Sequence, residues 1–158
     1  MSKKTGKLES IDFDTGINAI IPSTQESYRG DEFSGSVRHE EKQNLILFKQ
    51  SWGLKIDQDL KSSEQFPSDR EIFVFIVQYF AAEAEYVRRD IDNMAKTILD
   101  ILKGRFYRDD SQVKTLLVGK KRENRVPQNF AYVAIKELHS DRDIDALKIS
   151  GKDFYFNS

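Results

Sequence analysis

Four aspartates and one lysine with the chemistry of a cation site lie in one stretch of the chain. Asp90 and Asp92 are two residues apart, Lys96 follows four residues later, and Asp109 and Asp110 form a pair further on. Carboxylates are hard oxygen ligands, and two or three of them with open water positions suit Mg²⁺ or Mn²⁺ better than Zn²⁺. A nearby ammonium group can stabilise negative charge that develops on a phosphate. The pattern therefore indicates metal-assisted cleavage of a phosphodiester bond.

A helix predicted over residues 92–103 positions the first part of this stretch. Apolar residues recur along it at three- and four-residue spacing, and Gly104 follows as a natural stop. Asp92 and Asn93 are both good N-cap residues, and Lys96 is the i, i+4 neighbour of Asp92 on one helix face. A structural interpretation stays open, because Asp-x-Asp-Asn is also typical of helix capping and Asp-Asp-Ser of turns.

A metal site requires the separate acidic groups to meet in space. Asp90 points the same way as Asp92 if the approach to the helix is extended, since side chains two apart on an extended segment share a face. Asp109, Asp110 and Ser111 form the turn that enters a strand predicted over residues 112–120. A helix that returns to a neighbouring strand can place Asp110 beside Asp90 and Asp92.

This stretch resembles the RusA family of Holliday junction resolvases. The matching motifs are Asp-x-Asp-Asn-x-x-Lys at 90–96, Leu-Asp-x-Leu-x-Gly at 99–104 and Asp-Asp-Ser-Gln-Val at 109–113. The resemblance implies a homodimeric endonuclease that cuts four-way DNA junctions symmetrically in recombination and repair. It implies Mg²⁺ as cofactor, with Mn²⁺ as substitute, and a bacterial or phage origin. It assigns catalysis to Asp90, Asp92, Lys96 and Asp110, with the three aspartates as metal ligands.

Two alternatives to junction resolution remain open. A nuclease of the same fold could prefer forks, flaps or other branched DNA, and a DNA-binding module could keep the fold without catalysis. All four catalytic positions of the family are filled here, which argues against the second alternative. The first half of the chain and the residues after His139 carry no motif of the family that we can recognise.

Positive charge gathers around the acidic stretch. Residues 86–126 hold eleven Lys/Arg and six Asp/Glu, which leaves fourteen and twenty for the rest of a chain whose net charge is −1. Such a concentration favours phosphate binding beside a metal site. The predicted nucleic-acid contacts are Arg88, Arg89, Arg105, Arg108, Lys120, Lys121 and Arg122.

Length and composition limit the number of domains, the kinds of metal or catalytic site, and the cellular compartment. A chain of 158 residues suggests one domain over 1–158, with residues 1–10 and the tail after about 140 peripheral. There is no cysteine, which excludes a thiolate metal site. The two histidines leave few residues for a zinc site or a histidine-based triad. No apolar run reaches the roughly 18 residues of a membrane span, and the first ten residues lack the apolar core of a signal peptide. We expect a cytoplasmic protein with no membrane association and no small-molecule substrate.

The predicted fold is α+β, a small mixed sheet of about four strands packed with two helices. Strands are predicted at 17–21, 71–80, 112–120 and 129–138, and an edge piece earlier than residue 17 stays open as an alternative. A helix is predicted at 40–60, either continuous or broken near Gly53. Residues 81–86 could form one helical turn, 120–125 a basic hairpin tip and 141–147 a further helix. The run Glu71–Phe80 is almost continuously apolar, which predicts a strand covered on both faces. This strand and Trp52 are the candidate dimer contacts, and Trp52 is alternatively a core residue.

Overall fold

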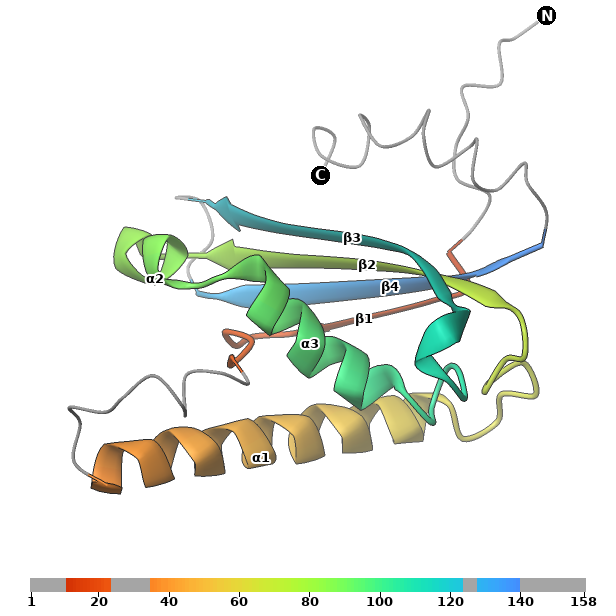
Figure 1. Ribbon diagram of the computed structural model, residues 1–158, viewed down its shortest axis with the longest axis horizontal. Coiled ribbons are helices and arrows are strands. Elements are labelled where there is room, and N and C mark those ends of the chain that lie inside the picture. The colour runs from red at the N-terminus through yellow and green to blue at the C-terminus, as the bar shows by residue number, and fades with distance from the viewer. Residues whose placement is uncertain (1–10, 24–34, 124–127, 140–158) are drawn as a thin grey trace, which may run out of the picture.

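The computed structural model describes residues 11–23, 35–123 and 128–139, without the side chains of 35–41. This part of the chain is α+β, as predicted, with one four-stranded mixed sheet. The strands are β1 (Phe13–Ile17), β2 (Glu71–Phe80), β3 (Val113–Arg122) and β4 (Phe130–Leu138). The helices are α1 (Gly35–Asp59), α2 (Glu83–Arg88) and α3 (Ile91–Leu102), with a 3₁₀ turn, η2 (Asp110–Gln112). Helices α1 and α3 lie on the same side of the sheet (Figure 1).

Strand β2 organises the sheet, whose order is β1-β4-β2-β3. It runs parallel to β3 and antiparallel to β4, and β4 in turn pairs antiparallel with β1. The connection from β2 through α2 and α3 to β3 is the helical crossover that two parallel neighbours require. This crossover carries the acidic stretch, so the sheet fixes where each end of α3 lies.

Both faces of β2 are buried, as its continuous apolar sequence predicts. Ile72, Val74 and Ile76 face the layer formed by α1 and α3. Phe73 and Phe75 alternate with them and belong to a second apolar cluster on the other face of the sheet. The strand predicted at 71–80 has the same limits as β2, because the apolar run in the sequence is as long as the strand that it forms.

Helix α3 confirms the helix predicted over 92–103, shifted by one residue at each end. Gly104 has φ +84°, a left-handed conformation that glycine adopts without strain. The predicted N-caps were wrong, because Asp92 and Asn93 lie inside the helix and Asp90 occupies the N-cap position. Asp90 is extended and its side chain makes no capping hydrogen bond.

The first strand lies earlier in the chain than the strand predicted at 17–21, at the place of the alternative edge piece. Strand β1 is Phe13–Ile17, whereas residues 18–23 leave the sheet. The backbone N–H of Ile21 donates to Gln78 Oε1 at 2.8 Å, and Thr97 Oγ1 donates to the carbonyl of Pro22 at 2.6 Å. These contacts hold the end of this segment against the sheet and α3, so Ile21 is buried and Ala19 and Ile20 are partly buried without being a strand.

Helix α1 is continuous through Gly53, and the alternative of a break there was wrong. The Arg105 guanidinium packs against this glycine, where an added Cβ would lie 2.6 Å from Arg105 Nη2. Arg105 also donates to Asp57 Oδ1 at 2.8 Å and to the carbonyl of Ile101 at 2.7 Å. One side chain therefore connects α1 with the end of α3, and Gly53 makes room for it.

Strand β3 extends the predicted 112–120 strand to Arg122, and β4 matches the predicted 129–138 strand within one residue. The predicted hairpin at 120–125 was wrong, because β4 pairs with β2 and β1 and does not neighbour β3. The helical turn predicted at 81–86 is α2, and the helix predicted at 141–147 lies outside the described residues. None of the described helices has the length and apolar character needed to cross a membrane.

The predicted dimer contacts lie inside a single chain. Trp52 is 1% exposed, packs edge-on against Phe48 and donates from Nε1 to Thr15 Oγ1 at 3.1 Å. Along β2 the end residue Glu71 is exposed and Tyr79 half-buried, while the rest of the strand is buried. Trp52 is therefore a core residue of the single chain.

Candidate metal and nucleic-acid site

The start of α3 brings together three of the predicted catalytic residues. Asp90 precedes the helix, Asp92 lies in its first turn and Lys96 follows one turn later. All three side chains are exposed, whereas Met94 and Ala95 between them are buried against the core. Amphipathic packing of α3 therefore turns the acidic and basic side chains outward on one face.

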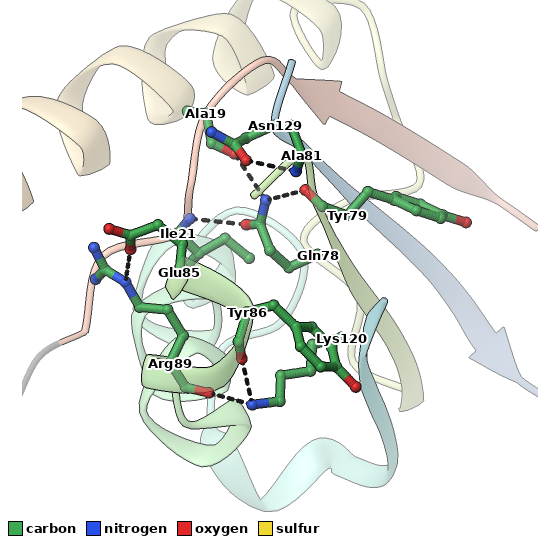
Figure 2. Close-up of polar contacts among 10 residues, drawn as sticks. All are labelled: Ala19, Ile21, Gln78, Tyr79, Ala81, Glu85, Tyr86, Arg89, Lys120 and Asn129. Carbon is green, nitrogen blue, oxygen red and sulfur yellow. Dashed lines mark hydrogen bonds and ion pairs between the residues drawn. The ribbon is translucent and has the colours of Figure 1, made fainter. Parts of the chain in front are cut away.

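The turn before Asp90 is held by a lysine from β3. Lys120 Nζ donates to the carbonyl of Tyr86 at 2.7 Å and to the carbonyl of Arg89 at 2.8 Å, as Figure 2 shows. The same ammonium lies 4.9 Å from the centroid of the Tyr86 ring, in cation–π geometry. Lys120 was predicted to contact nucleic acid, but its charged group is directed at the protein backbone.

A buried glutamine lies beside this turn in the sheet. Gln78 pairs with Lys120 in the β2–β3 register and is fully buried. Its Oε1 accepts from Ile21 N, and its Nε2 lies within hydrogen-bond distance of the carbonyls of Ala19 and Tyr79, at 3.0 and 3.1 Å (Figure 2). The carbonyl of Phe130, at 3.1 Å, shares the two N–H groups of this nitrogen with them. The sequence reasoning missed this residue, although a lone amide inside the apolar run of β2 was a usable signal.

The aspartate pair lies at the other end of α3. Asp109 caps η2: its side chain accepts from the N–H and hydroxyl of Ser111, and Gln112 reciprocates toward the backbone N–H of Asp109 at 2.9 Å. The Ser111 hydrogen bonds lower the pKa of the Asp109 carboxyl, since they favour its ionised form. Asp110 is exposed and pairs with Lys103, with 3.4 Å between Oδ2 and Nζ.

A buried tyrosine anchors this end of the helix. The Tyr107 hydroxyl donates to the carbonyl of Leu99 at 2.9 Å. Burial raises the pKa of Tyr107, and the carboxylates of Asp110 and Asp100 raise it further. The phenol is therefore neutral at physiological pH and keeps its donor role toward the end of α3.

The structure does not bring the three predicted metal ligands together in one chain. Asp90 precedes the first residue of α3, while Asp110 contacts Lys103 just after its last. Twelve helical residues separate the two ends by about 16 Å at 1.5 Å per residue. No group of three potential ligands occurs among the described residues, which include all four aspartates. The expectation that Asp110 lies beside Asp90 and Asp92 in the same chain was therefore wrong.

The donors still suit a divalent cation in their chemistry. Asp90 and Asp92 supply two exposed carboxylates to one region of the surface, which is the ligand type that Mg²⁺ and Mn²⁺ prefer. Mg²⁺ commonly keeps several waters and takes only one or two protein carboxylates. One chain thus offers a partial ligand set at the start of α3.

Most of the predicted nucleic-acid contacts already have a carboxylate partner within the chain. The pairs and their N···O distances are Arg89–Glu85 (3.0 Å), Arg105–Asp57 (2.8 Å), Arg108–Asp69 (2.7 Å), Arg122–Glu83 (3.0 Å) and Lys121–Glu123 (3.9 Å). Arg88 is exposed and makes no ion pair with any described residue. These pairs reduce the net positive field of the region, and Arg88 is the clearest candidate for a phosphate contact.

Comparison with known proteins bears on the whole of this region. The family model for the endodeoxyribonuclease RusA matches residues 34–135. The matched range runs from α1 into β4 and includes every residue predicted for catalysis, metal binding or nucleic-acid contact. A search among curated proteins finds no match to this chain.

Proposed function

Because this chain belongs to the RusA family of endodeoxyribonucleases, we propose that it resolves Holliday junctions by paired symmetrical nicks with Mg²⁺. The observation that carries the proposal is the exposed group of Asp90, Asp92 and Lys96 at the start of α3, within the matched range. A homodimer suits the reaction, since two-fold protein symmetry matches the two paired cuts that a four-way junction requires.

Each residue of this group has a role that its chemistry allows. Asp90 and Asp92 would hold the cation, and when bound it polarises the phosphate and lowers the pKa of a water. Lys96 lies one turn from Asp92, so its ammonium can face the phosphate oxygens on which negative charge develops. The exposure of all three side chains leaves the scissile phosphate free to approach from solvent.

We propose that Asp110 acts on the site of the other subunit. Asp110 is exposed and pairs with Lys103 beyond the far end of α3, a helix about 16 Å long, and it forms no ligand group with Asp90 among the described residues. A two-fold dimer can set the Asp110 end of one chain against the Asp90 end of its partner, and the same operation generates a second equivalent site. The two sites would then each take two carboxylates from one chain and a third from the other.

Mixed dimers test both the nuclease activity and this arrangement. Asp90→Asn and Asp110→Asn homodimers should each bind a labelled junction but fail to cut it in Mg²⁺. The mixed dimer combines one Asp90→Asn chain with one Asp110→Asn chain. If each site takes Asp110 from the other subunit, one of the two sites keeps all its carboxylates. That dimer should nick one strand. If instead each site is built within a single chain, both sites lack a carboxylate, and the mixed dimer should be inactive.

The control is a dimer of one unaltered chain and one Asp90→Asn chain, purified with the same pair of tags. It retains one intact site under either arrangement and should nick one strand. Cutting by this control together with an inactive mixed dimer would show that Asp110 does not act across the dimer. Cutting by the Asp90→Asn homodimer would remove Asp90 from the mechanism.

Substrate choice is tested by comparing four-way junctions, forks, flaps and linear duplex under the same conditions. Paired nicks at symmetrical positions in the four-way junction support resolution. Faster cutting of forks or flaps would favour the nuclease for other branched DNA. Binding of the junction without nicking in either Mg²⁺ or Mn²⁺ would favour the non-catalytic DNA-binding module.

A further inference from the structure

We propose that Lys120 is a positioning residue for Asp90, and that it sets the direction of this carboxylate by holding the turn between α2 and α3. The proposal rests on the proposed function, in which Asp90 is a metal ligand. It gives Lys120 a role other than the nucleic-acid contact predicted from its charge. The two roles predict different effects of the same substitution.

The ammonium of Lys120 makes three contacts with the segment from Tyr86 to Arg89. It donates at 2.7 Å to the carbonyl of Tyr86 and at 2.8 Å to that of Arg89, and it lies over the Tyr86 ring. Figure 2 shows the side chain reaching from β3 into the concave side of this turn. Lysine has three N–H donors, and two of them are used on these carbonyls.

The carbonyl of Arg89 connects Lys120 with Asp90, because it belongs to the peptide group that joins Arg89 to Asp90. A peptide group is planar, so the Arg89 carbonyl oxygen and the Asp90 N–H move as one unit. Fixing that oxygen on Lys120 sets the orientation of the peptide from which the Asp90 side chain projects. The Asp90 side chain does not cap α3, so its position follows the backbone of this turn and not a bond to the helix amides.

Helix α2 cannot hold this turn by packing alone. It has six residues, none of them buried, and an isolated helix of that length is unstable in water. Its other ties to the sheet are the Tyr86 ring against Phe80, at 6.0 Å between centroids, and the Arg122–Glu83 pair at 3.0 Å. Lys120 is the contact that reaches the carbonyl adjoining Asp90, and its own strand position is fixed by pairing with Gln78.

The test replaces Lys120 with methionine, which keeps most of the apolar stem and removes the donors. Loss of a residue that orients a metal ligand typically costs about 10- to 100-fold in metal affinity or activity. We therefore expect single-turnover cutting of a pre-bound junction to slow by about that factor. The Mg²⁺ concentration for half-maximal rate should rise. Junction affinity without Mg²⁺, and its dependence on salt, should not change.

A measurement on the metal-free protein separates this proposal from the proposed function. Amide hydrogen exchange at residues 86–93 should accelerate in Lys120→Met, whether or not the unaltered protein cuts junctions. Lys120→Arg can still donate to both carbonyls and should restore slow exchange and much of the cutting rate. Lys114→Met, an exposed lysine of the same strand, is the matched control and should behave like the unaltered protein.

Two results would overturn the proposal. One is unchanged exchange, rate and Mg²⁺ dependence in Lys120→Met. The other is weaker junction binding, with the slope of log affinity against log salt concentration reduced by about one, which is the behaviour of a phosphate contact. If the methionine variant does not fold, Lys120→Gln decides on the same measurements, because its amide is too short to reach both carbonyls. Failure of the unaltered protein to cut branched DNA would overturn the proposed function and leave the exchange result to stand.

Discussion

Asp109 and Asp110 are adjacent carboxylates with different partners. The Asp109 carboxylate accepts hydrogen bonds from the backbone and hydroxyl of Ser111, whereas the Asp110 carboxylate forms an exposed ion pair with Lys103. A capping carboxylate cannot leave its amides without opening η2, while an exposed ion pair of this kind contributes little to stability. Of the two, Asp110 is the one able to turn toward a cation.

The titration of Asp109 gives a prediction at this scale. Its pKa is lowered in the folded protein, chiefly by the Ser111 hydroxyl, so the cap adds stability above the unfolded-state pKa and loses it as pH falls through the folded-state pKa. Replacing Ser111 with alanine should raise the pKa of Asp109 toward its ordinary value. Carboxyl NMR titration of both proteins measures this. An unchanged Asp109 pKa in Ser111→Ala would mean that the hydroxyl is not its main partner in solution.

Helix α3 ends where it does because of one residue. Gly104 follows the last turn with φ +84°, and its N–H donates to the carbonyl of Tyr107 at 2.7 Å. This turn directs the chain into η2 and so places Asp110 at the end of the helix. The end of the element therefore determines the position of a predicted site residue.

Substitution of Gly104 tests this ending. An added Cβ would meet nothing within 4 Å, so the cost of Gly104→Ala is the left-handed backbone alone. We expect a loss of about 1 kcal/mol in the free energy of unfolding, measured in urea. Gly104→Asn should lose less, since asparagine tolerates this conformation. Equal stability of all three proteins would indicate that the turn relaxes to another conformation.

At the scale of the whole molecule, the basic side chains of the described residues differ in how far they are held by the protein itself. Arg105 lies between α1 and α3, bound to Asp57 and to the carbonyl of Ile101, and it fills the space above Gly53. Arg88 is exposed at the end of α2, two residues before Asp90. A count of positive charges in the sequence treats the two alike, but only an accessible cation can release counterions from DNA.

Junction binding measured over a range of salt concentrations separates these two arginines. Arg88→Ala should weaken binding and reduce the slope of log affinity against log salt by about one. Arg105→Ala should leave that slope unchanged and lower the free energy of unfolding by about 1 kcal/mol, through its lost hydrogen bonds. The opposite assignment of slope and stability would contradict the structural division.

Much of the fold could be predicted from local features. The period of apolar residues identified α3, the apolar run identified β2, and Gly104 marked a helix end, because each feature acts within a few residues of itself. The errors arose where distant contacts decide. Gln78 and Thr97 draw residues 19–23 out of the sheet, and Arg105 makes Gly53 tolerable inside a helix.

The sequence alone determined the family, because the acidic motifs and their spacing lie in one continuous stretch, and the match to residues 34–135 agrees with it. It also predicted which carboxylates are the candidate metal ligands. Only the tertiary structure decided where those side chains lie relative to one another. The order of the strands and the length of α3 separate Asp110 from Asp90 and turn Lys120 toward Arg89. Such distances depend on packing between elements far apart in the chain, which no local pattern encodes.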